Sequence, residues 1–300
     1  MAERAAHVGV LTQKADELAE LFTPTAPLPL PSGLDPDHAL TFLVLRAALR
    51  FGSGYEPKLR LQAAETAADN LDAALANLFA TSGPPAPRDM VHATAAEVAQ
   101  LRGQGLEDPP QAEFVELQTR AVRDLGRYLI DRHEGSFDRL VESAQGSAAR
   151  LCESLSTIPY FNDVQRYRGI DVPFFHRAQR LVCDLAVEAN GDGLGRFEDM
   201  RELAPSSDAE CALALRTAGV LSYDAQLTER VDHGEIVPAH SEREVEIRAA
   251  AIHAFERVAT KIQARLPEVT AVEVDRWLRE RAREARRSGA QPHRTRSVFY

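Results

Sequence analysis

The chain has 300 residues, of which 44% are hydrophobic and 27% are charged, and its formal net charge at pH 7 is −10. This length and balance are typical of a globular protein with a substantial buried core. The acidic balance argues against a protein that wraps long nucleic acid, because neutralising many phosphates needs a basic surface. A single nucleotide is compatible with it, since one local basic pocket can hold that ligand.

Cysteine usage and hydropathy indicate the compartment. The three cysteines, Cys152, Cys183 and Cys211, form no CxxC pair, which predicts reduced thiols and no disulfide framework. No apolar run approaches roughly 18 residues, and the first residues lack the basic-then-apolar pattern of a signal peptide. We therefore expect a cytoplasmic monomer that has no membrane partner.

Helix signals follow one another through the first half of the chain, and strand signals are scarce. The apolar spacing predicts helices over 10–22, 36–51, 61–79, 94–103 and 111–133. Asp35-Pro36 offers an N-cap followed by a proline in the first turn, and Thr94 to Glu97 forms a capping box.

The second half continues in the same way. It predicts a helix over 137–155, another from Pro173 to about 189, and two more opened by capping boxes at Ser241–Glu244 and Thr270–Glu273. Residues 190–193 read as a loop. Because no repeat or low-complexity linker divides the chain, we expect one compact all-α domain over 1–300. Within it, residues 1–34 form an N-terminal helix and a Pro-rich loop, and 290–300 form a tail.

The common metal and nucleotide motifs give no support. The nine histidines include no HExxH pattern and no cluster at ligand spacing, so we predict no metal and no cofactor. The stretch Phe51-Gly52-Ser53-Gly54 has no strand before it and no GK[ST] after it. A GxSxG motif for serine hydrolase chemistry is also missing.

The helix after Pro173 carries a polar stripe. His176, Gln179 and Arg180 stand at i, i+3 and i+4 and therefore share one face, which is either functional or simply solvated. The apolar residues predict a buried alternate face; they are Phe174, Ala178, Leu181, Val182 and Leu185.

Asp208 and the C-terminal arginines also have two readings each. Asp208 follows Ser206-Ser207, so an ordinary helix N-cap is a strong alternative to a functional carboxylate. The segment 276–296 holds eight arginines, most of which we expect on a solvated helix surface. The tail that ends in Phe299-Tyr300 either docks and completes a phosphate-binding pocket or is a disordered end.

Six short motifs occur in a distinctive order between Tyr160 and Asp224. They are Tyr160–Asp163, Val172–Gln179, Cys183–Leu185, Arg196–Asp199, Ser206–Asp208 and Ala218–Asp224. This order and spacing resemble the queuosine salvage family, nucleotide N-glycosylases that release queuine from queuosine 5'-phosphate and so serve tRNA modification. The resemblance extends from about Ala39 to Tyr300, and it implies a helical fold related to helical DNA glycosylases.

The resemblance also implies the roles of particular residues. Asp208 matches the family's catalytic aspartate, which stabilises the positive charge that develops on the ribose. The implied substrate-binding residues are His176, Gln179, Phe51, Tyr55, Asp163, Asp199, Arg294 and Arg296.

This chain departs from the family pattern at three places. His176 stands where the family has lysine, Ser206-Ser207 replaces Phe-Ala, and Leu49–Ser53 replaces an aromatic motif.

The expected reaction is hydrolysis of queuosine 5'-phosphate, or a related 7-deazapurine nucleotide, to queuine and ribose 5-phosphate. Two alternatives stay open. One is an N-glycosidase for a different modified nucleotide, and the other is a catalytically inactive nucleotide-binding protein of the same fold.

Overall fold

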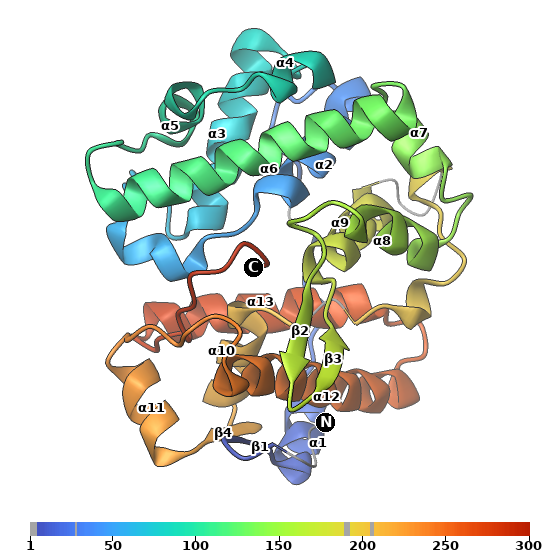
Figure 1. Ribbon diagram of the computed structural model, residues 1–300. Helices are drawn as coiled ribbons and strands as arrows, with labels where there is room; N and C mark the ends of the chain where they lie inside the picture. Colours follow the sequence, from blue (N-terminus) through green and yellow to red (C-terminus); the bar gives the residue numbers. More distant parts are fainter. Residues whose placement is uncertain (1–4, 28, 189–192, 205–206) are drawn as a thin grey trace. The chain divides into compact units, whose positions relative to one another are not determined.

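The computed structural model describes residues 5–27, 29–188, 193–204 and 207–300 (Figure 1). The chain divides into two compact units. The first comprises Met1–Pro27, Val164–His176 and Leu203–Arg296, and the second comprises Leu28–Asp163, Arg177–Glu202 and Ser297–Tyr300. Each unit therefore gathers segments that are distant in the sequence.

In the described residues, the first unit packs five α-helices around one core and carries two small antiparallel ribbons. Its elements are β1 (Val8–Val10), α1 (Thr12–Glu20), β2 (Val164–Tyr167), β3 (Ile170–Pro173), α10 (Ala209–Thr217), β4 (Leu221–Tyr223), α11 (Ala225–Asp232), α12 (Glu242–Arg265) and α13 (Ala271–Arg287). Strand β1 pairs with β4, and β2 pairs with β3. Helices α1, α10, α12 and α13 supply most of the core, where Leu215, Phe255 and Trp277 are buried.

The second unit is built along its longest helix, α6. Its α-helices are α2 (Ala39–Leu49), α3 (Ala67–Ser82), α4 (Pro87–Val91), α5 (Ala95–Arg102), α6 (Pro109–His133), α7 (Phe137–Glu142), α8 (Ala148–Ser156) and α9 (His176–Glu188), the last beginning with a residue of the first unit. Four 3₁₀ helices complete it: η2 (Pro36–His38), η3 (Ser53–Lys58), η4 (Gly193–Gly195) and η5 (Met200–Glu202). Gly126 lets α4 approach α6 closely, because a Cβ there would lie 2.7 Å from the Pro87 carbonyl oxygen.

The described part of the chain is predominantly α-helical, as predicted. Two of the three predicted capping boxes are confirmed: Thr94 and Glu97 cap α5, and Thr270 and Glu273 cap α13, through reciprocal side-chain and backbone hydrogen bonds. At the third, Ser241 caps α12 by accepting from the Glu244 amide, but the Glu244 carboxylate faces Arg248 and does not complete the box. Such pairs satisfy amide groups that a helix start leaves without partners. All three cysteines are buried and free, and within the described ranges no helix is both long and apolar enough to cross a bilayer.

The predicted helix over 137–155 is wrong, because two helices occupy this stretch. Helix α7 ends at Glu142, and α8 begins at Ala148 after a turn in which Gln145 and Gly146 have φ of 49° and 73°. Ser147 then caps α8 by accepting a hydrogen bond from the amide of Arg150 at 3.2 Å. A polar turn with a left-handed glycine thus interrupts an otherwise helical apolar pattern.

Two other helix starts were placed too early. Pro173 ends strand β3 and does not lie in the first turn of α9, which begins at His176 after Phe175 with φ of 45°. Helix α3 begins at Ala67, where Thr66 makes a capping box that we had not recognised.

The N-terminal prediction needed a smaller correction, because strand β1 occupies 8–10 before α1 begins. Of the predicted loop at 190–193, residues 190–192 lie outside the described residues, as does Ser206.

Candidate functional site

Asp208 stands at the N-terminus of α10, in the first unit. Its backbone is extended, and its Oδ1 accepts a hydrogen bond from the amide of Cys211 at 3.0 Å. The side chain is therefore a true helix N-cap, as one of the two sequence readings predicts. The cap uses only one carboxylate oxygen, however, and Oδ2 takes part in a separate cluster of charges.

Arg279 of α13 binds that second oxygen. Its Nη1 lies 2.7 Å from Asp208 Oδ2, and its Nε lies 2.8 Å from Oδ2 of Asp275, one helical turn earlier on α13. Burial alone would raise the pKa of Asp208, but the Arg279 cation, assisted by His176, holds it well below its usual range. Burial likewise opposes the charge of Arg279, and the two aspartates outweigh it, so its pKa is raised well above its usual value. Asp208 is consequently a fixed anion at neutral pH.

His176 is a second neighbour of Asp208. It begins α9 directly after the β2–β3 ribbon, and its Nε2 lies 3.4 Å from Asp208 Oδ2. The other ring nitrogen, Nδ1, is buried and has no hydrogen-bond partner among the described residues. Nη2 of Arg279 is likewise buried and has no hydrogen-bond partner there. Buried donors are normally satisfied in a folded protein. These two atoms beside Asp208 are therefore available to a polar ligand.

A second layer of buried charge supports the segment that carries Asp208. Arg248 of α12 is fully buried; its Nε donates to the backbone carbonyl of Ser207 at 3.0 Å, and its guanidinium lies 3.9 Å from the Phe174 ring centroid. Glu244, one turn earlier on α12, faces the same guanidinium at 3.5 Å. Burial, reinforced by the Arg248 charge, lowers the pKa of His293 to about 4. This layer holds the start of α10 in place.

Chemically, the Asp208 cluster can stabilise positive charge without changing its own protonation. An ionised carboxylate that is already fixed by an amide and a guanidinium needs no reorganisation when a cation develops beside it. The same depressed pKa makes Asp208 a weak proton acceptor. The geometry therefore favours electrostatic or nucleophilic action by this carboxylate over general-base action.

The structure brings only one other predicted site residue, His176, into contact with Asp208. Phe51 and Tyr55 belong to the second unit, where both rings are buried and pack on Phe114 with centroids 6.1 Å and 5.6 Å away. The Tyr55 hydroxyl also donates to Glu113 at 2.9 Å. These contacts make both rings part of a core, and stacking on a base stays a prediction.

The predicted polar residues of the second unit have structural contacts too. Asp199 caps α8, accepting hydrogen bonds from the Ser147 hydroxyl at 2.7 Å and from the amide of Ala148 at 2.5 Å. Asp163 is 1% exposed and lies in the field of Arg177. Gln179 lies on α9, within the half-buried part of that helix. Ligand recognition by all three stays a prediction.

The C-terminal tail packs against the rest of the chain. Of the two sequence interpretations, a docked tail and a disordered end, the docked tail is the one observed. In the first unit, Arg294 Nη1 donates to the Gly234 carbonyl at 2.5 Å, and the Thr295 hydroxyl donates to the Val237 carbonyl at 3.0 Å. In the second unit, Tyr300 is buried and its carbonyl accepts from the amide of Gly52 at 3.3 Å. Phosphate binding by Arg294 and by Arg296 stays a prediction.

Sequence reasoning missed Arg279, which we had placed among solvated helix arginines. Helix α13 is rich in arginine, but most of these arginines are half-buried and Arg287 is the exposed one, so the predicted solvated surface is wrong for most of them. The available signal was the i, i+4 pair Asp275–Arg279 beside the apolar positions Val274 and Leu278, all of which lie toward the core. A charged pair on the apolar face of a helix indicates a buried partner elsewhere, which here is Asp208.

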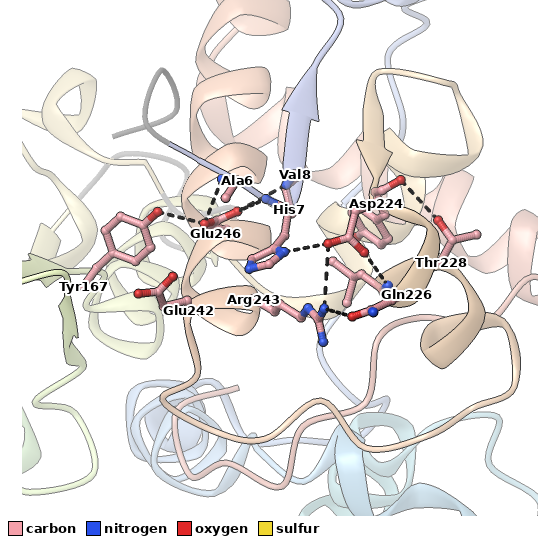
Figure 2. Close-up of polar contacts among 12 residues, drawn as sticks. Ala6, His7, Val8, Tyr167, Asp224, Gln226, Thr228, Glu242, Arg243 and Glu246 are labelled. Atoms are coloured by element: carbon pink, nitrogen blue, oxygen red, sulfur yellow. Dashed lines mark hydrogen bonds and ion pairs between the residues drawn. The ribbon is translucent and has the colours of Figure 1, made fainter.

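A further cluster surrounds Glu246 in the first unit (Figure 2). Its Oε1 accepts hydrogen bonds from the Ala6 amide at 3.0 Å and the Tyr167 hydroxyl at 2.8 Å. Its Oε2 accepts from the amides of His7 at 2.6 Å and Val8 at 3.2 Å. Burial and this hydrogen bond raise the pKa of Tyr167 to about 12. One carboxylate thus attaches the segment that leads into β1 to helix α12.

The same region contains three side chains of a type that could ligate a metal ion. Ligand atoms of His7, Glu242 and Glu246 lie within 4.8 Å of one another, and Asp224 Oδ2 lies 2.6 Å from Nδ1 of His7. Glu246, however, already accepts four hydrogen bonds, which occupy all of its lone-pair positions. Arg168 in turn pairs with Glu242 at 2.8 Å. The arrangement is therefore an anchor for the N-terminal strand and does not fit a metal centre.

Comparison with known proteins gives a consistent result. A family model described as "Queuosine salvage protein" matches residues 64–300. The chain is 32% identical over 266 residues to the queuosine 5'-phosphate N-glycosylase/hydrolase of Sphaerobacter thermophilus, covering 86% of this chain and 80% of that protein.

Two further relatives carry the same name. Those of Dictyostelium discoideum and Schizosaccharomyces pombe are 31% and 29% identical over 213 and 199 residues, or 70% and 62% of this chain. The matched regions cover 64% and 57% of those two proteins, so the chain spans about three fifths of their length.

Proposed function

We propose a function from the premise that this chain belongs to the queuosine salvage protein family. In this proposal the protein hydrolyses the N-glycosidic bond of queuosine 5'-phosphate, or of a closely related 7-deazapurine nucleotide, and releases queuine and ribose 5-phosphate. The relatives that carry this activity in their names support the proposal. The structural observation that carries it is Asp208, a buried carboxylate kept ionised by Arg279 at 2.7 Å.

The proposed chemistry uses the properties of that carboxylate. Cleavage of the bond between C1′ and the base builds positive charge on the ribose, and the Asp208 anion stabilises it. Water supplies a hydroxyl to C1′, and its proton goes to the departing base. A 7-deazapurine has no N7 to protonate, so stabilisation of the ribose cation carries more of the catalysis. The unpartnered ring nitrogen of His176 and the unpartnered Nη2 donor of Arg279 fit hydrogen bonds to sugar hydroxyls.

We further propose a cytoplasmic monomer that acts on a free nucleotide and not on a nucleic-acid polymer. The formal charge of −10 supports this, because a polymer would be repelled by most of the surface. The family match over 64–300 includes segments of both units, which supports one functional domain.

One observation favours a second candidate function. His176, which lies 3.4 Å from Asp208, stands where the family resemblance expects a lysine. A histidine brings a planar ring and a titratable charge where lysine brings a permanent ammonium. This difference would suit N-glycosidic hydrolysis of another modified nucleotide.

The test is direct detection of the released base. Purified protein is mixed with queuosine 5'-phosphate, and queuine is measured by mass spectrometry beside an Asp208→Ala control. Release by the wild type alone supports both the activity and the role of the carboxylate. Release from a panel of other modified nucleotides, but not from this one, supports the second candidate. If no deazapurine nucleotide is bound or cleaved, the proposal is wrong.

A further inference from the structure

Ser207, the residue immediately before Asp208, carries a hydroxyl that the chemistry described above does not use. The residue is 0% exposed, and its Oγ has no hydrogen-bond partner within the ranges that the structure describes. Its backbone is held in place, because Nε of Arg248 donates to the Ser207 carbonyl oxygen at 3.0 Å. A buried hydroxyl without a partner lowers the stability of a fold, and native proteins rarely contain one. Packing alone therefore does not explain a serine at this position.

The family pattern sharpens this point. Ser207 stands where that pattern has an alanine, whose methyl group fills a similar volume without a polar atom. The hydroxyl is thus a feature of this chain that the shared fold does not require.

Two further polar atoms beside Asp208 resemble the Ser207 hydroxyl. Nδ1 of His176 and Nη2 of Arg279 are also buried and without a hydrogen-bond partner in the part of the chain that is described. Nε2 of His176 and Nη1 of Arg279 lie 3.4 Å and 2.7 Å from Asp208 Oδ2. Ser207 joins the same aspartate through one peptide bond, so the two Cα atoms are about 3.8 Å apart. Three polar atoms without partners therefore belong to the immediate neighbours of one carboxylate.

The chemistry of these three atoms favours an uncharged group that is rich in hydroxyls. Nη2 of Arg279 only donates, Nδ1 of His176 donates or accepts according to its tautomer, and Oγ of Ser207 does both. A sugar hydroxyl matches this mixture, because it also donates and accepts. A phosphate group brings negative charge, which the ionised carboxylate of Asp208 repels.

We propose that Ser207 is a specificity-determining residue whose hydroxyl forms a hydrogen bond with a hydroxyl group of the ribose. The inference rests on the proposed function, since it concerns the sugar of the same substrate at the same site. It adds one contact that an alanine cannot make. A sugar that lacks the contacted hydroxyl leaves the buried Ser207 oxygen without a partner, so the chain discriminates against that sugar.

The first experiment measures binding of ribose 5-phosphate by titration calorimetry, which needs no turnover. Ser207→Ala should bind this ligand about three- to tenfold more weakly than the wild type, because one neutral hydrogen bond is lost. Ser288→Ala is the matched control. Ser288 is an exposed serine of the same unit, its hydroxyl donates to the Glu284 carbonyl at 3.0 Å, and its loss should leave the affinity unchanged. The inference is overturned if the wild type does not bind ribose 5-phosphate, or if Ser207→Ala binds it equally well.

Sugars that lack one hydroxyl identify the contact. We titrate 2-deoxyribose 5-phosphate and 3-deoxyribose 5-phosphate against the wild type and Ser207→Ala. For the hydroxyl that Ser207 contacts, the loss of affinity on removing it should be about three- to tenfold smaller in the variant, because both changes remove the same hydrogen bond. If the losses are additive for both sugars, Ser207 contacts neither hydroxyl and the inference is wrong.

Thermal unfolding separates a lost contact from a damaged fold. Because Ser207→Ala removes a buried hydroxyl without a partner, its Tm in ligand-free buffer should equal or exceed that of the wild type. A lower Tm would show that the hydroxyl is satisfied inside the protein, and this result also contradicts the inference.

The queuine-release assay distinguishes this inference from the proposed function. If queuine is released but binding of ribose 5-phosphate does not depend on Ser207, this inference fails and the proposed function stands. If binding of the sugar depends on Ser207 but queuine is never released, the proposed reaction fails and the ribose contact stands.

Discussion

Asp208 in the first unit and Asp184 in the second are both buried aspartates whose pKa values are held low by arginine. The charge around them differs. Arg279, the cation at Asp208, is shared with Asp275, and Oδ1 of Asp208 is occupied by a backbone amide. Asp184 faces Arg46 and Arg180 directly and Arg50 through space. The first cluster places two carboxylates around one guanidinium, and the second places Arg46 and Arg180 around Asp184, with Asp72 and Glu188 acting on Arg46 through space.

The comparison shows that the same residue types can hold an aspartate ionised in two different arrangements of charge. An arginine flanked by two carboxylates has no charge to spare, so it serves to position Asp208. Asp184 holds Arg46 and Arg180 together despite their repulsion, and Asp72 and Glu188 add negative charge near Arg46. The number of partners for each charge predicts the role better than burial, which is similar in the two clusters.

The largest effect is expected from removing the charge of Asp208. Asn keeps a side-chain oxygen for the helix cap, so Asp208→Asn should fold, while single-turnover release of queuine should fall on the order of 10³-fold. Asp131→Asn, a change at an exposed aspartate of α6, is the matched control and should leave turnover intact. If Asp208→Asn released queuine as fast as the wild type, the charge of Asp208 would not contribute to catalysis, and the functional contrast between the two clusters would be lost.

The next effect concerns the stability of the first cluster. Arg279→Met leaves two buried carboxylates without their cation and should lower the free energy of unfolding by about 3–5 kcal/mol at pH 7. Because the folded pKa of Asp208 is depressed, its contribution is present above the unfolded value near 3.9 and is lost as pH falls through the folded pKa.

The wild-type and Arg279→Met unfolding curves, measured in urea, should therefore differ most at neutral pH and converge in acid. A loss of the same size at pH 3 and pH 7 would show that Arg279 acts by packing and not by charge.

The layer behind Asp208 predicts a separate acid sensitivity. The pKa of His293 is about 4 in the folded chain and near 6.5 when unfolded, so the unfolded state takes up a proton first. Stability should fall as pH drops from about 6.5 to 4, by roughly 3 kcal/mol in total. His293→Gln cannot take up this proton, and denaturant titrations across that range should show a flatter slope. An unchanged slope would show that a group other than His293 causes the loss of stability in this pH range.

The smallest effect is expected at Arg180 in the second cluster. Arg180→Gln removes one contact from Asp184 but leaves Arg46 at 2.7 Å and relieves repulsion between the cations. The free energy of unfolding should change by about 1 kcal/mol or less, in contrast to Arg279→Met. Equal losses for the two variants, measured by urea unfolding under the same conditions, would show that Arg46 alone does not keep Asp184 ionised.

Much of the fold is predictable from local signals. The helix starts at Thr94 and Thr270 were placed correctly, because the capping box is contained within one turn, although the same pattern at Thr66 and Asp69 was overlooked. The break between α7 and α8 was missed, since Gln145 and Gly146 interrupt an apolar pattern that continues on both sides. Pro173 was misplaced because a proline suits the end of a strand as well as the start of a helix.

The candidate site was less predictable than the fold. Asp208 was found through its family motif and His176 through its place on one helix face, and the structure brings the two together. Arg279 was missed because its partner lies 71 positions earlier in the chain, and because it is one of several arginines along α13 that sequence alone does not distinguish. Pairing across such a separation is set by tertiary packing, which no local pattern encodes.

The anchor at Glu246 has a consequence for the timing of biosynthesis. The amide of Ala6 and the carboxylate that receives it are separated by 240 positions. At roughly 5–20 residues per second, a ribosome needs on the order of 10–50 seconds between the two. During that interval the segment leading into β1 has been made but its acceptor has not. The first unit must therefore be completed late in translation, after the long internal stretch 28–163 of the second unit has already been synthesised.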